Sequence, residues 1–257
     1  MDSFQAHYAH IHDPGWQPRI AAQLRERGLV TFSGIADHAG LAAVARRLMT
    51  IRPHRDAGPD GVTVITGTQA QGSGYAAFTD AELIPHTDGS SVPDPPGLLL
   101  LTCQQAAGQG GRTRVADGAR IISTLAEQCP AALHALSAPR ASFFGAAGGY
   151  LGAVVEPAGP GRTRIRLRLD DLAWFSADAA DAVPLLRTVI ADHVQTFQLR
   201  AGEGVLLSNT RWLHGRDSFA GRRTMLRVLG DPLPNTGIMP GFPSPAPTTG
   251  TQTPRAA

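Results

Sequence analysis

The sequence predicts a mainly β protein with flanking helices, of the jelly-roll (double-stranded β-helix, cupin-like) kind. Three observations predict this fold class. Many short apolar stretches are separated by turns that contain glycine or proline. The helical patterns gather near the N-terminus and in the middle of the chain. The regular alternation of strands and helices that marks a doubly wound parallel sheet does not occur.

The N-terminal part is expected to place two helices around one short strand. Residues 17–28 repeat apolar side chains at near-helical spacing and end on Gly28, the residue type favoured just past a helix C-terminus. Residues 29–32 form a short apolar strand. Residues 37–49 carry a second apolar stripe at helical spacing.

Short strands dominate the next part of the chain. A strand at 62–66 is followed by a loop rich in Gly, Gln and Ala that runs to Asp80. A loop of this kind is a natural place for substrate contacts or a lid. Residues 98–103 form a run of leucines typical of a strand that is buried on both faces. Further strands are expected at 83–89 and 112–116.

After residue 116 the sequence predicts three helices and a series of short strands. Residues 163–169 show strict period-2 patterning, with arginines on one face of a strand and Ile or Leu on the other. Helices are expected at 117–127, 131–137 and 178–194, and strands at 195–200, 204–208, 211–216 and 223–229.

The chain is expected to form one domain with a C-terminal tail. Its 257 residues are enough to bury a sizeable core. Residues 1–232 would form a single jelly-roll domain with N-terminal helices. Residues 233–257 are rich in Pro, Thr and Gly, and we expect much of this tail to be flexible.

The composition excludes several classes of function. The formal net charge is +2, so nothing indicates a nucleic-acid or membrane-surface partner. All basic side chains other than histidine are arginines, which excludes a lysine Schiff base and a P-loop lysine. Two cysteines do not make a disulfide scaffold. The first residues lack the basic and apolar regions of a signal peptide, and we expect a soluble cytoplasmic protein.

The stretch around His86 and Asp88 carries the strongest functional signal. In an extended strand residues i and i+2 point to the same face, so one imidazole and one carboxylate converge there. They supply two of the three ligands of a 2-His-1-carboxylate triad, the site type that holds non-haem Fe(II) with open coordination positions. The third ligand has to come from elsewhere, and His214 near the C-terminal end is the candidate.

Arginines gather after the candidate third ligand. Arg223 and Arg227 lie four apart on a predicted strand and therefore share a face. Their apolar neighbours indicate that the strand is buried, and a buried arginine needs an anionic partner. A planar guanidinium grips a carboxylate with two parallel hydrogen bonds. An arginine beside a metal is what a dicarboxylate co-substrate requires at its far end.

Several motifs together resemble a known family. They are His86-Thr87-Asp88, Pro95-Pro96-Gly97-Leu98-Leu99-Leu100, Gly110-Gly111-Arg112-Thr113, Leu213-His214-Gly215-Arg216 and Arg223-Thr224-Met225-Leu226-Arg227. In order and spacing they resemble the Fe(II)/2-oxoglutarate-dependent dioxygenases of the taurine dioxygenase and clavaminate synthase-like group. The resemblance covers about residues 82 to 230.

The resemblance implies roles for individual residues. His86, Asp88 and His214 would be the catalytic iron ligands. Thr113 and Arg223 would bind the distal carboxylate of 2-oxoglutarate. Arg227 would contact either 2-oxoglutarate or an anionic group of the substrate. Because the gap from His214 to Arg223 is short for the group, Arg227 stays an alternative to Arg223 as the co-substrate arginine. Asn209 would occupy a structural polar position.

The resemblance also implies a reaction. Fe(II), 2-oxoglutarate and O2 would oxidise a small molecule, such as an amino acid or a natural-product intermediate, with succinate and CO2 as co-products. Because Asp88 leaves no room for a halide ligand, hydroxylation, desaturation, cyclisation or epimerisation is expected in preference to halogenation. The arginines are compatible with an anionic or amino-acid-like substrate, and Tyr75, Phe78 and Arg216 are candidate substrate contacts.

The sequence fits two other functions less well. A nicotinamide-dependent reductase is disfavoured because the glycines after residue 66 do not fit the dinucleotide-binding spacing. A non-catalytic cupin-like protein that binds a small molecule would keep the fold without turnover. The intact set of His86, Asp88 and His214 argues against it.

Overall fold

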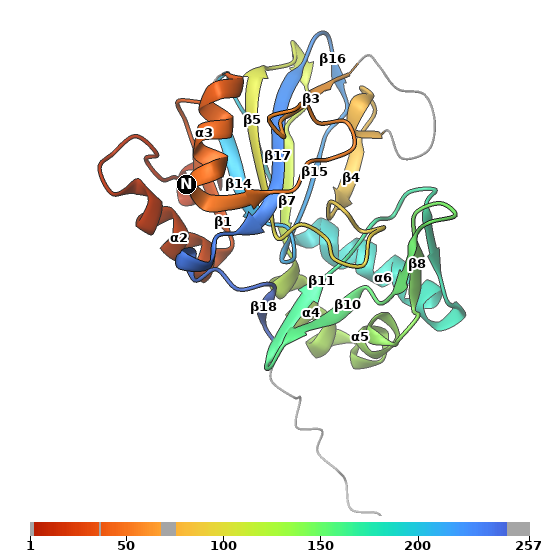
Figure 1. The fold of residues 1–257 in the computed structure, drawn as a ribbon. Coiled ribbons are helices and arrows are strands. Elements are labelled where there is room, and N and C mark those ends of the chain that lie inside the picture. The colour runs from red at the N-terminus through yellow and green to blue at the C-terminus, as the bar shows by residue number, and fades with distance from the viewer. Residues whose placement is uncertain (1–2, 36, 68–75, 246–257) are drawn as a thin grey trace, which may run out of the picture.

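A six-stranded antiparallel sheet is the largest sheet of the computed structural model, which describes residues 3–35, 37–67 and 76–245 (Figure 1). In spatial order its strands are β1 (Leu29–Phe32), β14 (Gly204–Ser208), β5 (Leu98–Gln105), β17 (Thr224–Pro232) and β2 (Met49–Ile51), with β3 (Thr63–Thr66) also paired to β17. Strands distant in the sequence are thus neighbours in space.

A four-stranded antiparallel sheet lies against this first one. Its strands, in spatial order, are β13 (Val194–Phe197), β7 (Thr113–Asp117), β15 (Trp212–Arg216) and β4 (Leu83–His86). Leu99 and Val205 of the first sheet share one buried cluster with Val115 and Trp212 of the second. The inner faces of the two sheets therefore enclose a common apolar core.

Helices cover the outer faces of both sheets. α2 (Trp16–Arg27) and α3 (His38–Leu48) pack on the six-stranded sheet, where Leu98 and Leu100 face them while Leu99 faces inward. This alternation explains why the leucine run of β5 is apolar throughout. On the four-stranded sheet, Ala116 and Leu213 contact α4 (Gly118–Gln128), α5 (Pro130–Ser137) and α6 (Ala177–His193).

The remaining elements are short. They are α1 (Ser3–Ala6), η1 (Ala76–Phe78), η2 (Pro234–Thr236), the strand pair β6 (Gln109–Gly110) and β16 (Phe219–Ala220), the sheet of β8 (Ser142–Phe144), β9 (Tyr150–Gly152) and β12 (Ala173–Phe175), and the sheet of β10 (Val155–Gly159), β11 (Arg162–Ile165) and β18 (Phe242–Pro243). Among the helices of the described residues, none has both the length and the apolar character that crossing a bilayer requires.

The expected mainly β class with flanking helices is confirmed, and four details differ from the sequence-based expectation. The strand predicted at 83–89 ends at His86, so Asp88 follows the strand in a turn. The helix predicted at 37–49 ends at Leu48 because Met49 already pairs with Pro232 in the sheet. The strand predicted at 163–169 ends at Ile165. The tail segment 233–245 carries η2 and β18, and its Phe242 side chain is almost fully buried.

Candidate metal centre

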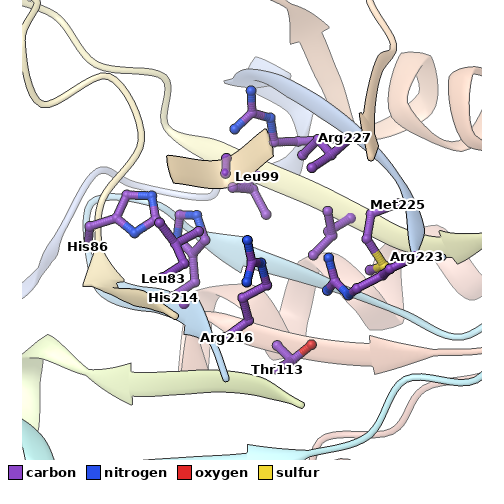
Figure 2. A pocket seen from close by; sticks show the side chains of 13 residues that line it. Leu83, His86, Leu99, Thr113, His214, Arg216, Arg223, Met225 and Arg227 are labelled. Atoms are coloured by element: carbon purple, nitrogen blue, oxygen red, sulfur yellow. The ribbon is translucent and has the colours of Figure 1, made fainter. Parts of the chain in front are cut away.

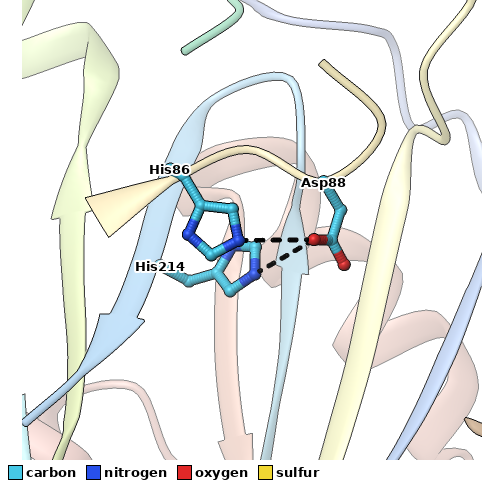
Figure 3. Close-up of side chains that lie close together, drawn as sticks. All are labelled: His86, Asp88 and His214. Atoms are coloured by element: carbon cyan, nitrogen blue, oxygen red, sulfur yellow. Dashed lines mark ion pairs between the residues drawn. The ribbon is translucent and has the colours of Figure 1, made fainter. Parts of the chain in front are cut away.

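His86, Asp88 and His214 meet at the open edge of the four-stranded sheet (Figure 3). His86 ends β4 and lies directly opposite His214 of β15 in the antiparallel register. Gly215 permits this close pairing, because a Cβ atom there would lie 2.3 Å from the carbonyl oxygen of Leu83. β4 also contains a proline, which an edge strand tolerates. The pairing of β4 with β15, which Gly215 permits, therefore sets the two imidazoles side by side.

The distances fit a single metal ion. Oδ1 of Asp88 lies 3.4 Å from Nε2 of His86 and 3.8 Å from Nε2 of His214. One ligand atom from each of the three residues lies within 4.8 Å of the other two. Two atoms that each bind one ion at about 2.1 Å are at most about 4 Å apart. The donor set of two imidazoles and one carboxylate is the one expected for non-haem iron.

The protonation states of Asp88 and His214 also suit a metal. Burial alone would raise the pKa of Asp88, but the Arg227 guanidinium and the two imidazoles outweigh it and hold that pKa well below its usual range. Burial, with a contribution from His86, lowers the pKa of His214 to about 3. An ionised carboxylate and a neutral imidazole are the forms that bind metal ions.

The backbone orients the imidazole of His86. Its Nδ1 lies 3.0 Å from the carbonyl oxygen of Ile84, to which it can donate a hydrogen bond, so Nε2 is the nitrogen that faces Asp88. Nδ1 of His214 is buried and has no hydrogen-bond partner among the described residues. The structure thus presents Nε2 of His86 for coordination without further rearrangement.

Arg227 contacts the candidate metal ligand directly. Its Nη1 donates to Oδ2 of Asp88 at 2.9 Å, while Oδ1 of the same carboxylate faces the two histidines. Only 6% of the Arg227 surface is exposed. The carboxylate is therefore shared, with one oxygen for a metal and one for the guanidinium.

The pocket beside the triad extends between the two sheets (Figure 2). The space inside it is narrow, with a volume of about 50 Å³. The polar lining comprises His86, His214, Thr113, Arg216, Arg223 and Arg227, and the apolar lining includes Ile65, Ala77, Leu83, Leu99, Leu101 and Met225. In the view of Figure 2, Thr113 and Arg223 lie together at the side away from the histidines.

Arg223 is the arginine of this pocket that has neither an ion pair nor a hydrogen bond among the described residues. It is 8% exposed, and burial lowers its pKa. Among the described residues it forms no ion pair; its nearest aromatic contact is the ring of Phe219, 5.5 Å from the guanidinium carbon. Gly111 of the Gly-Gly-Arg-Thr segment packs on it, since a Cβ atom there would lie 3.4 Å from Nε of Arg223. A buried, unpaired guanidinium favours binding of an anion.

Arg216, predicted as a substrate contact, lines the pocket, but its guanidinium is already hydrogen-bonded to the protein backbone. Its guanidinium donates to the backbone carbonyls of Ala76, Thr79 and Ala81, so it ties the 76–81 segment to β15. Burial lowers the pKa of Arg216 to about 10. Of the other predicted substrate contacts, Phe78 packs beside the inner core cluster and does not line the pocket, and Tyr75 lies outside the described residues.

Sequence reasoning did not single out the apolar lining or His54. Leu99, Leu101 and Met225 follow the same period-2 pattern as ordinary core positions, so no local signal separates them. His54 lies in the segment after β2. Burial lowers its pKa, and the charges of Arg227 and Asp88 also act on it, which places it near the metal centre.

The depressed pKa of His214 predicts how stability changes with pH. The unfolded protein binds a proton at His214 near pH 6.5 but the folded protein only near pH 3, so the free energy of unfolding falls as the pH drops through this interval. Between pH 7.5 and 5 this loss amounts to about 2 kcal/mol. Urea titrations at pH 7.5 and pH 5 measure this change in the free energy of unfolding. Between the two pH values, we expect the decrease to be about 2 kcal/mol smaller in the metal-free His214→Gln variant than in the unmodified protein. An equal loss in both proteins would contradict the assignment of a buried neutral imidazole.

Comparisons with known proteins agree with this geometry. The family described as "Taurine catabolism dioxygenase TauD, TfdA family" matches residues 4–229. Human gamma-butyrobetaine dioxygenase is 26% identical over 172 residues, which cover 60% of this chain and 44% of the relative. Trimethyllysine dioxygenase of the yeast Meyerozyma guilliermondii is 24% identical over 169 residues, 58% of this chain and 42% of the relative. The chain thus matches less than half the length of these curated relatives.

Solved structures show the same fold. Asparagine oxygenase (AsnO) superposes with a TM-score of 0.69 at 19% identity, covering 90% of this chain and 85% of its own. PvcB, an iron and α-ketoglutarate-dependent oxygenase of an isonitrile synthetic pathway, gives a TM-score of 0.65 at 20% identity, covering 86% and 84%. The non-haem iron oxygenase OrfP with iron and α-ketoglutaric acid gives 0.62 at 17% identity, covering 88% and 86%. From the match over residues 4–229, the chain belongs to the TauD/TfdA dioxygenase family.

Proposed function

We propose that this chain is an Fe(II)- and 2-oxoglutarate-dependent oxygenase that hydroxylates, or otherwise oxidises, a small molecule, with succinate and CO2 as co-products. The observation that carries the proposal is the pairing of two features in one pocket. His86 and His214 of the 2-His-1-carboxylate set line one side, and the buried Arg223, which forms no ion pair among the described residues, lines the other. The cation needs an anion and the metal leaves coordination positions open, so a dicarboxylate can satisfy both.

The residues present fit the metal. Two imidazoles and an ionised carboxylate form the donor set, and Ile84 and Arg227 orient two of the three side chains. Bound iron, together with 2-oxoglutarate, would supply the activation of dioxygen for oxidation of the substrate. The chain's own part is to hold His86, Asp88 and His214 in place and to keep this pocket partly closed to water by the apolar side chains around it.

The co-substrate's distal carboxylate is assigned to Arg223 and Thr113. Both line the pocket and both are buried, with Thr113 3% exposed. The hydroxyl of Thr113 can donate one hydrogen bond and the guanidinium two. Arg227, the alternative, is committed to Asp88 through Nη1. This difference supports Arg223 as the co-substrate arginine and places Arg227 at the metal ligand.

The substrate class follows from chemistry and relatives together. The structure of asparagine oxygenase contains 3-hydroxyasparagine and succinate, and OrfP structures contain hydroxylated arginine. Hydroxyasparagine and hydroxyarginine are both free amino acids, which carry a charged α-amino group and an α-carboxylate. We infer that an amino acid, or a natural-product intermediate with a similar anionic group, is the substrate here. Because Asp88 provides a carboxylate ligand, oxygenation or a related oxidation is favoured over halogenation.

The finer architecture belongs to the same proposal. The two facing antiparallel sheets support a double-stranded β-helix, in which the four-stranded and six-stranded sheets are its two walls. Residues 1–232 would form the single catalytic domain. Residues 233–257 would form a C-terminal extension, and in its described part Phe242 packs with Leu213 and Ile165 in one buried cluster.

An anaerobic titration tests the proposed site. Adding 2-oxoglutarate to the purified protein with one equivalent of Fe(II) is expected to produce a visible charge-transfer band that saturates at one equivalent, because the co-substrate chelates the metal. Succinate, which lacks the 2-oxo group, is the control and should give no band. Tight binding of small molecules with neither the band nor any succinate formed in air would instead favour a non-catalytic binding protein.

A further inference from the structure

Asn209 holds the backbone of the candidate metal ligand Asp88. Its Oδ1 accepts a hydrogen bond from the Asp88 N–H at 2.8 Å, and its Nδ2 donates to the Asp88 carbonyl oxygen at 2.8 Å. The same Nδ2 donates to the carbonyl oxygen of Pro96, also at 2.8 Å. Asn209 is 1% exposed. All three contacts are therefore shielded from water.

The Asn209 carboxamide makes the two backbone hydrogen bonds to Asp88 that a neighbouring strand would otherwise make. Asp88 lies two residues beyond the end of β4, outside the ladder that pairs β4 with β15. An asparagine side chain carries one acceptor and two donors on a planar group, so it can bond an N–H and a C=O of the same residue as a neighbouring strand would. An aspartate offers only acceptors and an alanine offers neither.

The loop between Asp88 and Gly97 is closed at both ends by Asn209. The Asn209 side chain bonds Asp88 and Pro96, and its backbone N–H donates to the carbonyl oxygen of Gly97 at 2.9 Å. These contacts span the stretch of chain that follows the metal ligand. The loop ends are thus fixed to the turn that leads from β14 into β15.

Arg166 holds the middle of the same loop. It is 1% exposed and donates to the carbonyl oxygens of Ser90, Val92 and Pro93. Its guanidinium also contacts the carboxylate of Glu156 at 3.3 Å. With its carbonyls bonded to side chains from other elements, the loop after Asp88 is held in one conformation before any ligand binds.

We propose that Asn209 is a positioning residue that presets the Asp88 backbone for metal binding. Asn209 lies in the connection between β14 and β15, five residues before His214 of β15. Its side chain therefore links the carboxylate ligand to the strand that carries the distal histidine. Together with Arg227 on Oδ2, it fixes Asp88 at the backbone and at the carboxylate. This role rests on the metal site proposed above, and it makes Asn209 one of the residues that determine the affinity of that site for the metal.

Cobalt(II) binding to the metal-free protein tests this role without requiring turnover. Asn209→Ala and Asn209→Asp are expected to raise the Co(II) dissociation constant by about 10- to 100-fold, as losses of residues that orient metal ligands do. The aspartate variant keeps the acceptor for the Asp88 N–H but places an oxygen against two carbonyls. The absorption of bound Co(II) and titration calorimetry both report the affinity.

Two control variants separate positioning from general stability. Asn235 is the other asparagine of the sequence and is exposed, so Asn235→Ala should leave the affinity unchanged. Leu125 is fully buried in the α4–α6 cluster, away from the metal centre, so Leu125→Ala should lower the melting temperature without weakening Co(II) binding. A loss of melting temperature alone in the Asn209 variants, with the Co(II) affinity within twofold of the unmodified protein, would overturn the proposal.

Hydrogen exchange on the unmodified, metal-free protein provides a second measurement. The Asp88 amide is expected to exchange slowly because its N–H is bonded to Asn209 inside the structure. Exchange of this amide as fast as that of an exposed loop would reject the proposal even if no Asn209 variant folds. If the unmodified protein itself fails to bind Co(II), the metal site is wrong; if it binds and the variants bind equally well, only the role of Asn209 is wrong.

Discussion

Replacing His86 or His214 by alanine is expected to abolish stoichiometric iron binding and to reduce turnover to background. Each variant removes one of three protein ligands and leaves two, and the loss of one ligand is expected to weaken binding on the order of a thousandfold. Iron content after anaerobic loading and desalting, measured by a colorimetric chelator assay, checks the result. His134→Ala, which changes an exposed helical histidine, is the matched control and should load fully.

The two histidine variants should behave alike because the two rings are neighbours in one register pair. His86 lies opposite His214, and their ring centroids are 4.5 Å apart. Full retention of one equivalent of iron in either variant would reject the assignment of that residue as a ligand. Because each removed ring is largely buried, the melting temperature of the metal-free variants is measured alongside, so that a loss of folding is recognised as such.

Replacing Arg223 by methionine is expected to weaken 2-oxoglutarate binding by about 100- to 1,000-fold while leaving Co(II) binding unchanged. The guanidinium is buried and has no ion pair among the described residues, so it is free to bind the distal carboxylate, and losing one partner of a buried charge pair costs about 2–5 kcal/mol. Calorimetric titration of the metal-free protein with Co(II), and of the Co(II)-loaded protein with 2-oxoglutarate, gives the two dissociation constants. Arg222→Met, at the exposed neighbouring position, is the control.

The same Arg223 substitution has an opposite expected effect on the free protein. Without 2-oxoglutarate, the buried guanidinium is uncompensated, so methionine of similar length should leave the metal-free protein as stable or more stable. Arg227→Met should behave differently, because it strips Asp88 of its partner and thereby alters metal affinity. If Arg227→Met weakens 2-oxoglutarate binding at constant metal affinity and Arg223→Met does not, the two roles are reversed.

Much of the metal centre could be predicted from local sequence, and the rest required the fold. The spacing of His86 and Asp88 places two candidate ligands on one side of the chain where that chain is extended. The partnership with His214 depends on the register of β4 against β15, a non-local pairing that no periodicity reveals. Family resemblance supplied that third ligand, and the geometry agrees with it.

The arginines show where patterning misleads. Arg223 and Arg227 both line the pocket, as their spacing predicts, yet one is unpaired and the other bonds Asp88. Spacing assigns a face of a strand but not a partner. Arg166 belongs to an alternating Arg pattern that suggests one polar strand face, but it is fully buried because Glu156 and three loop carbonyls satisfy it.

The tail shows a second limit of composition. Residues 233–245 are rich in Pro and Gly, which favours an irregular chain, yet β18 pairs with β11 there. Phe242 inserts into the cluster of Leu213 and Ile165. A single large apolar side chain can thus anchor a segment whose average composition predicts disorder, because burying it contributes about 2–3 kcal/mol.

Isotope labelling tests directly whether the protein is an oxygenase centred on His86, Asp88 and His214. The protein is incubated with Fe(II), 2-oxoglutarate and a panel of amino acids under ¹⁸O₂, and the succinate is examined by mass spectrometry. The proposed function predicts succinate that carries one ¹⁸O atom, formed in the unmodified protein and lost in the His86→Ala variant. Succinate without ¹⁸O, or labelled succinate formed equally by that variant, would contradict an oxygenase centred on His86, Asp88 and His214.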